Sequence, residues 1–96
     1  MEIIVVGKPQ AVLPLVEQLA ADHGGLKELL MSSFTLRARC EDGSVIDTVA
    51  QEGCRGHKAD EVWVSSAIDK EVLTDIITPM LMGHFDNLHY FSEKGF

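Results

Sequence analysis

The chain has 96 residues, 46% of them hydrophobic, which predicts a single domain over residues 1–96 with an apolar core. Fifteen acidic and eight basic side chains give a formal net charge of −7, which argues against direct binding of nucleic acid or of an anionic membrane surface. No apolar run reaches the roughly 20 residues that span a membrane, and the first residues resemble a strand rather than a signal peptide, so we expect a cytoplasmic protein.

The first predicted element is a strand over Glu2–Val6, since this apolar run ends at Gly7. A helix is expected to begin at Pro9 or at the next residue, because proline is tolerated in the first turn of a helix. The pair Gly24-Gly25 is expected to end this helix. Its apolar face consists of residues at helical spacing, namely Val12, Leu13, Val16, Leu19 and Ala20.

Short elements are predicted in the middle of the chain. Leu26–Met31 is expected to add one or two helical turns, and the alternating residues 34–41 predict a half-buried strand with a basic outer face. The pair Asp42-Gly43 predicts a two-residue hairpin turn. The resulting register pairs Ala38 with Asp47 and places a carboxylate on the apolar face, so we expect either a bulge or an incompletely covered face there.

Residues 51–58 are expected to form a loop that gathers reactive side chains. Cys54 is next to Arg55 and near His57, so Cys54 and His57 are candidates for a thiolate nucleophile and its partner. Cys54 and His57 also form half of a zinc motif, but a tetrahedral site needs further ligands with a supporting shell. We therefore expect no metal and no cofactor, and we expect Cys40 and Cys54 to be reduced thiols.

The stretch Glu61–Met82 combines a strand with the most periodic segment of the chain. The run Val62–Val64 predicts a strand covered on both faces, and its Trp63 is expected to be a core residue. Ser66 is a candidate helix N-cap, with Asp69 as its partner in a capping box. The helix that follows has an apolar face made of Val72, Leu73, Ile76, Ile77, Met80 and Leu81.

The order of elements predicts an α/β sandwich of the α+β type. A last strand over Leu88–Ser92 completes the order strand, helix, short helix, three strands, helix, strand. Strand–helix units favour parallel neighbours, whereas a hairpin is antiparallel. We therefore expect a mixed five-stranded sheet with two main helices packed on it, and the units that begin at Glu2 and Glu61 are expected to lie side by side.

Two pairs of residues are candidates for a ligand-binding site. Gly7 and Lys8 follow the first strand, Ser65 and Ser66 follow a later one, and parallel strands would bring all four to one edge of the sheet. Ligands bind at the carboxyl ends of the strands in open α/β sheets. The segment lacks the glycine-rich run of a phosphate-binding loop, so ordinary turn and capping roles are the simpler interpretation.

Aromatic residues and methionines concentrate towards the C-terminus, where the last strand is expected to lie at a sheet edge. Such residues are enriched at protein interfaces. Some of them are expected to be buried in the core of the domain, and the rest to form a surface for self-association or for another partner. The predicted interface residues are Met82, Phe85, His89, Tyr90, Phe91 and Phe96.

Two classes of function stay open. The first is a small acidic, non-enzymatic protein-interaction module, expected to be a homodimer, which docks as an inhibitor on a basic, nucleic-acid-handling protein, as small virus-encoded antagonists do. The second is a small ligand-binding domain or a cysteine-dependent enzyme that uses the strand-end edge and the loop with Cys54. The net charge and the lack of a complete catalytic constellation in the sequence favour the first class.

Overall fold

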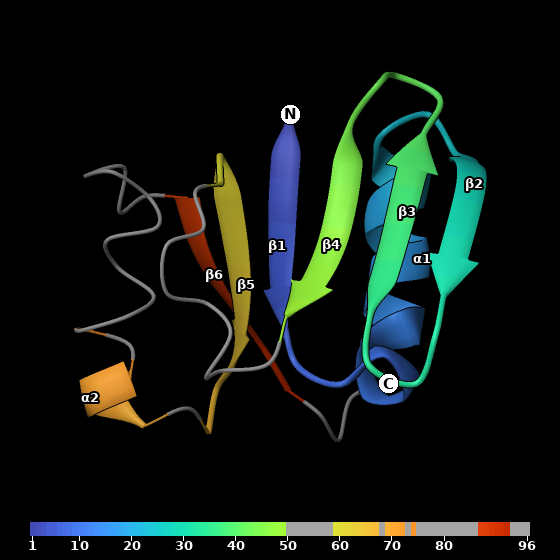
Figure 1. Ribbon diagram of the computed structural model, residues 1–96. Helices are drawn as coiled ribbons and strands as arrows, with labels where there is room; N and C mark the ends of the chain where they lie inside the picture. The colour runs from blue at the N-terminus through green and yellow to red at the C-terminus, as the bar shows by residue number, and fades with distance from the viewer. Residues whose placement is uncertain (50–58, 68, 73, 75–86, 93–96) are drawn as a thin grey trace.

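The computed structural model describes residues 1–49, 59–67, 69–72, 74 and 87–92, and six described strands form one mixed sheet (Figure 1). The strands are β1 (Glu2–Val6), β2 (Leu26–Met31), β3 (Leu36–Cys40), β4 (Val45–Val49), β5 (Glu61–Ser65) and β6 (Leu88–Phe91), and the helices are α1 (Pro9–Asp22) and α2 (Lys70–Val72). The strands lie in the order β2-β3-β4-β1-β5-β6. All pairings are parallel except the two that β3 makes with its neighbours.

β1 lies inside the sheet and pairs in parallel with β4 on one side and β5 on the other. The two predicted strand–helix units therefore begin on adjacent strands, as expected. Ile3 and Val5 are buried with the residues of α1, and Ile4 and Val6 are buried on the opposite face. An apolar run without polar interruption suits a strand that is buried on both faces.

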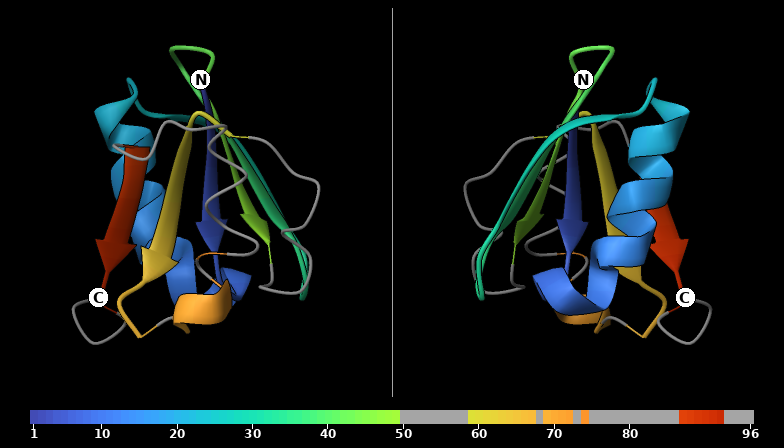
Figure 2. Two further views of the ribbon diagram at one scale, coloured as in Figure 1. Left: turned by 90° about the vertical axis from the view of Figure 1, so that its left-hand side faces the viewer. Right: turned by 90° about the vertical axis from the view of Figure 1, so that its right-hand side faces the viewer.

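α1 packs on one face of the sheet, against β2, β3 and β4 (Figure 2). It begins at Pro9, as predicted, and Gly24 and Gly25 follow its end with positive φ. The N–H of Gly25 donates to the carbonyl of Ala20 at 2.9 Å and closes the last turn. The buried residues of α1 are Pro9, Val12, Leu15, Val16, Leu19 and Ala20.

The prediction of helical turns over Leu26–Met31 is wrong, because this segment is the edge strand β2. Its leucines, lysine, glutamate and methionine favour a helix locally. A segment of this length after Gly25 is too short for a stable isolated helix, whereas pairing with β3 supplies its backbone hydrogen bonds. The mixed sheet is confirmed, but it has six strands instead of five.

The described residues contain one long helix instead of the predicted two. α2 spans three residues, and positions 73 and 75–82 of the predicted second helix lie outside the described part of the chain. None of the helices in that described part is long and apolar enough to cross a membrane.

The start of α2 also differs from the prediction, because its cap is Asp69 and not Ser66. The Asp69 carboxylate accepts the N–H of Glu71 at 2.9 Å. The N–H of Ser66 donates instead to the carbonyl of Phe91 at 2.8 Å, which prolongs the pairing of β5 with β6.

The hairpin between β3 and β4 closes over three residues rather than the predicted two. The N–H of Cys40 donates to the carbonyl of Ser44 at 2.8 Å, so Cys40 faces Ser44 and not Val45. Glu41, Asp42 and Gly43 form the connection, with Gly43 at a φ of 91°. The extra residue in the turn shifts the register of the whole hairpin by one position.

This shift resolves the predicted conflict at Asp47. A slip of one residue turns each side chain of a strand to the opposite face. Asp47 therefore pairs with Arg37 on the face away from α1, with Nε of Arg37 3.7 Å from Oδ1 of Asp47. Ile46 takes the core position opposite Ala38, and both side chains are buried.

Gly7 tests the close contact between the end of β1 and α1. A Cβ at Gly7 would lie 2.8 Å from Cγ1 of the buried Val12. We expect Gly7→Ala to lower the free energy of unfolding by about 1–3 kcal/mol, measured by urea denaturation. Val12→Ala removes the clashing methyl group, so the double variant should lose less than the sum of the two single losses. Strictly additive losses would contradict this contact.

Candidate functional site

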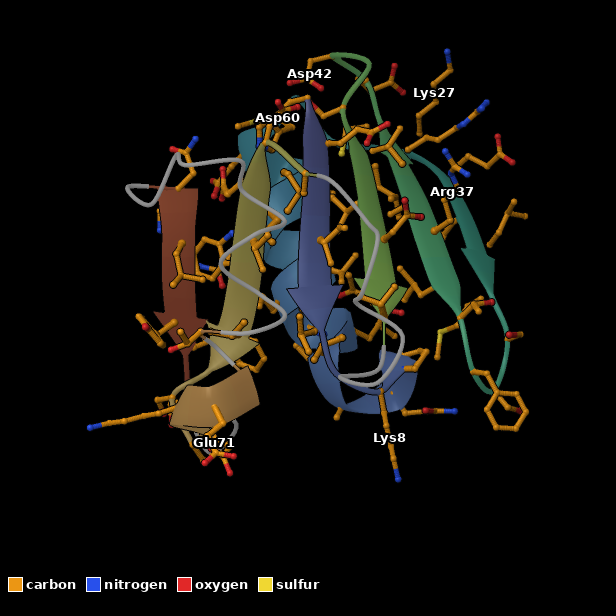
Figure 3. All side chains as sticks on the ribbon, turned by 60° about the vertical axis from the view of Figure 1, so that its left-hand side comes forward. Lys8, Lys27, Arg37, Asp42, Asp60 and Glu71 are labelled. Atoms are coloured by element: carbon orange, nitrogen blue, oxygen red, sulfur yellow. The ribbon has the colours of Figure 1, made fainter. Side chains whose placement is uncertain are left out.

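The predicted strand-end residues do lie together. Gly7 and Lys8 follow β1, and Ser65 and Ser66 lie at the same end of its parallel neighbour β5. Lys8 is exposed and points away from the end of the sheet (Figure 3). The sequence therefore placed these four residues correctly relative to one another.

Several backbone donors at this end are already used within the protein. The N–H of Gly7 donates to the carbonyl of Val49 at 2.9 Å, and the N–H of Ala67 donates to Oγ of Ser65 at 3.2 Å. In the first turn of α1, the N–H groups of Ala11 and Val12 donate to the carbonyl of Lys8. An anion-binding turn needs unoccupied N–H groups, and these groups are not available for one.

The predicted nucleophile Cys54 and its partner His57 lie outside the described residues. Cys40 is buried in the core, and burial, followed by the nearby Asp42 carboxylate, raises the pKa of its thiol. A raised pKa keeps the thiol protonated, so Cys40 does not suit nucleophilic chemistry. Within the described ranges, no group of three or more His, Cys, Asp and Glu side chains is arranged to hold a metal ion.

A cluster of His23, Asp42 and Ser44, which the sequence did not predict, joins the end of α1 to the β3–β4 turn. Nδ1 of His23 lies 3.0 Å from Oδ2 of Asp42 and 3.3 Å from Oγ of Ser44. A nucleophilic triad has the acid on one ring nitrogen and the serine on the other. Here both contacts are made by the same nitrogen, so the cluster fixes the turn instead of activating Ser44.

The C-terminal strand β6 is an edge strand of the described sheet, as predicted. Tyr90 is 52% exposed, and the side chain of His89 is 40% exposed. Phe91 is buried in the core with the residues of α1, so it does not belong to the exposed surface for which it was predicted. The other predicted interface residues, Met82, Phe85 and Phe96, lie outside the described part of the chain.

Trp63, Glu61 and His89 form a second cluster, between β5 and β6. The Trp63 and His89 rings stack, with centroids 4.7 Å apart and an interplanar angle of 23°. The indole N–H of Trp63 donates to Oε1 of Glu61, which lies 3.7 Å from Nε2 of His89. Trp63 is half-buried and packs against the core, so it lies at the margin of the core and not at its centre.

An apolar surface that the sequence did not predict lies at the opposite edge of the sheet. All six residues of β2 are exposed, with Leu30 at 60%. Phe34, in the turn between β2 and β3, is 86% exposed. We call this surface the apolar edge and define it by its five exposed side chains, Leu26, Leu29, Leu30, Met31 and Phe34.

One pattern in the sequence could have indicated the apolar edge. Leu29, Leu30 and Met31 are three consecutive large apolar residues, and a strand directs consecutive side chains to opposite faces. An edge strand with this pattern presents apolar groups on both faces. The pattern has no such meaning in a helix, and Leu26–Met31 was predicted to be helical.

An open hollow of about 570 Å³ lies beside the apolar edge, between β2, β3 and β4. Its described lining includes Leu30 and Val49 as apolar residues and the pair Arg37 and Asp47 as charged residues. Thr48 also lines it, and Oγ1 of Thr48 is the one buried side-chain polar atom without a partner among the described residues.

Asp42 gives the fold a dependence on pH. The Ser44 backbone N–H lowers the pKa of Asp42 most, with further lowering by the Ser44 hydroxyl and by His23. A depressed pKa in the folded state stabilises the protein above the ordinary value of 3.8, and this stabilisation is lost as the pH falls through the folded value. We expect Asp42→Asn to flatten the fall in melting temperature below about pH 4. Glu17→Gln is the control for the loss of one negative charge. If the melting temperature of Asp42→Asn falls with pH as steeply as that of the wild type, the expectation is contradicted.

The buried hydroxyl of Thr48 leads us to expect that its removal stabilises the fold. This hydroxyl is buried without a partner, and an unsatisfied buried group carries a desolvation cost. We expect Thr48→Val to raise the free energy of unfolding by roughly 1 kcal/mol in urea denaturation. Thr48→Ala is the control, because it removes the methyl group as well and should be less stable than Thr48→Val. A loss of stability in Thr48→Val would mean that the hydroxyl does have a partner, such as a buried water.

No family model matches the chain, and neither a curated protein nor a solved structure is significantly similar to it. No function is therefore carried over from a relative. The exposure and chemistry of the chain's own side chains carry the functional proposal.

Proposed function

We propose that the chain is a small acidic, non-enzymatic protein-interaction module that acts in the cytoplasm. The observation that carries this proposal is the apolar edge, where Leu30 and Phe34 are largely exposed on an edge strand and its turn. Contiguous exposed apolar side chains mark interaction sites in small proteins. An edge strand also offers backbone groups to which another protein can bind.

We further propose that the module docks, as an inhibitor, on a basic protein that handles nucleic acid, as small virus-encoded antagonists do. The net charge of −7 supports a basic partner. Four exposed carboxylates lie where β1 and β5 begin and at the β3–β4 turn, and Figure 3 shows two of them, Asp42 and Asp60, at one end of the sheet. The full set at this acidic end is Glu2, Glu41, Asp42 and Asp60.

The second candidate function is a small ligand-binding domain or a cysteine-dependent enzyme. This candidate is supported by the position of four residues at the carboxyl ends of the adjacent parallel strands β1 and β5, namely Gly7, Lys8, Ser65 and Ser66. The occupied N–H groups at that end weaken it. A pH profile of Cys54 alkylation separates the candidates, since a nucleophile requires a thiolate near neutral pH.

The acidic end predicts binding that depends on salt. The immobilised chain is exposed to an extract of its natural host cells, and retained proteins are identified by mass spectrometry. We expect a basic protein whose binding weakens at least about threefold between low and physiological salt, because exposed charges are screened.

A matched pair of variants tests the surface itself. Glu2→Lys with Glu41→Lys changes the acidic end, whereas Glu17→Lys with Glu71→Lys makes the same change of net charge at exposed residues of α1 and α2, and Figure 3 shows Glu71 at the opposite end of the sheet. Only the first pair should abolish retention of the basic protein. Equal retention by both pairs, or retention that salt does not alter, would exclude a basic partner at this end.

A further inference from the structure

Within the described part of the chain, the apolar edge has backbone groups without a strand partner as well as apolar side chains. The N–H of Ser32 donates to the carbonyl of Thr35 at 2.8 Å, so the backbone groups of Ser32 face β3. Backbone groups alternate in direction along a strand. Those of Leu29 and Met31 therefore face away from β3, on the side where the described sheet ends.

We propose that β2 pairs antiparallel with β2 of a second copy of the chain, with Leu30 of both copies at the two-fold axis. Leu30 then lies opposite its counterpart on the face away from α1. Leu29 of each copy lies opposite Met31 of the other on the α1 face, and these residues exchange about four backbone hydrogen bonds. The two six-stranded sheets become one continuous sheet.

The side chains favour this register over the neighbouring ones. With Met31 at the axis, Leu30 would face Ser32 and Leu29 would face Ser33, so apolar groups would oppose hydroxyl groups. With Leu29 at the axis, Glu28 would face Leu30 and Lys27 would face Met31, so charges would oppose apolar groups. With Glu28 at the axis, two carboxylates would lie directly opposite each other, which is destabilising. Leu30 at the axis places apolar residues opposite apolar residues on both faces.

The same register uses the remainder of the apolar edge. The strand register shifts between Leu26 and Glu28, and beyond this irregularity Leu26 of each copy lies towards the turn that carries Phe34 in the other copy. At roughly 200 Å² for a fully open side chain of this size, the exposed fractions of the five residues amount to on the order of 500 Å² per copy. An interface that covered all of this surface would bury about 1,000 Å² in total, which is the lower limit of specific interfaces.

The charges near the apolar edge favour a second copy over a basic partner. Lys27, Arg37 and Arg39 lie on β2 and β3, and Figure 3 shows Lys27 and Arg37 on this side of the sheet. Within one copy, Arg37 lies 3.7 Å from Asp47, and Arg39 lies opposite Glu28 in the strand register. A second copy therefore meets locally balanced charge. This inference rests on the proposed interaction role of the apolar edge and names its occupant.

A cysteine scan of β2 tests the register in a background in which Cys54 is replaced by serine and the buried Cys40 is kept. Leu30→Cys should form a disulfide-linked dimer, because opposite residues of a non-hydrogen-bonded pair have Cα atoms about 4.5 Å apart. Glu28→Cys and Leu29→Cys should stay unlinked, since neither faces its own counterpart. Linkage at position 28 or 29 but not 30 would overturn the proposal.

Two lysine variants test which edge associates. Leu30→Lys places like charges at the axis and should raise the dimer dissociation constant at least about 30-fold, measured by sedimentation equilibrium. Tyr90→Lys makes the same kind of change on β6, the opposite edge, and should leave the dimer intact. Circular dichroism confirms that each variant is folded. A wild-type monomer at all concentrations, or a dimer that only Tyr90→Lys disrupts, would overturn the proposal.

The outcomes separate this inference from the proposed function. If the wild-type chain is monomeric and Leu30→Lys abolishes retention of another protein, the second copy is excluded while the protein-interaction role stands. If self-association does not depend on Leu30, and retention of a partner depends neither on Leu30 nor on the acidic end, both proposals fail.

Discussion

The burial of β1 between two parallel partners is the constraint on which the rest of the structure depends. Its four apolar side chains are buried on both faces, and each contributes about 1.5–3 kcal/mol relative to exposure. Because β4 and β5 both pair with β1, the β3–β4 hairpin and β2 extend the sheet in one direction and β6 extends it in the other. The two edges that carry exposed apolar or aromatic groups therefore follow from the position of one strand.

The exposure of β2 has a geometric cause in the width of α1. A helix with its side chains is about 10–12 Å wide, whereas neighbouring strands lie about 4.8 Å apart. One helix therefore covers two to three strands, and α1 packs more closely on β3 than on β2 or β4. Leu29 and Met31 lie on the face that α1 covers, but β2 is at the margin of that cover, so both side chains stay exposed.

The acidic end and the apolar edge are separate surfaces on the described part of the chain. Lys27, Arg37 and Arg39 flank the apolar β2 edge, whereas Glu2 and Asp60 lie side by side where β1 and β5 begin, joined by the hydrogen bond that the Glu2 N–H donates to the Asp60 carboxylate. Surfaces of such different chemistry suit different partners, since apolar groups provide affinity and charges provide selectivity and orientation. The proposed self-association and the proposed docking on a basic protein therefore use different surfaces.

Local pattern in the sequence determined β1, α1, β3 and the mixed α/β class. Burial on both faces leaves a continuous apolar run, as in β1, and burial on one face leaves a period of two or 3.6 residues, as in β3 and α1. It also placed Gly7 and Ser65 at one end of the sheet, although it could not show that the N–H groups there are occupied. Only the tertiary structure decided that Leu26–Met31 is a strand and that Asp47 lies outside the core. The physical reason is that strand pairing, register and exposure at an edge are set by contacts between segments distant in sequence, which local propensity does not contain.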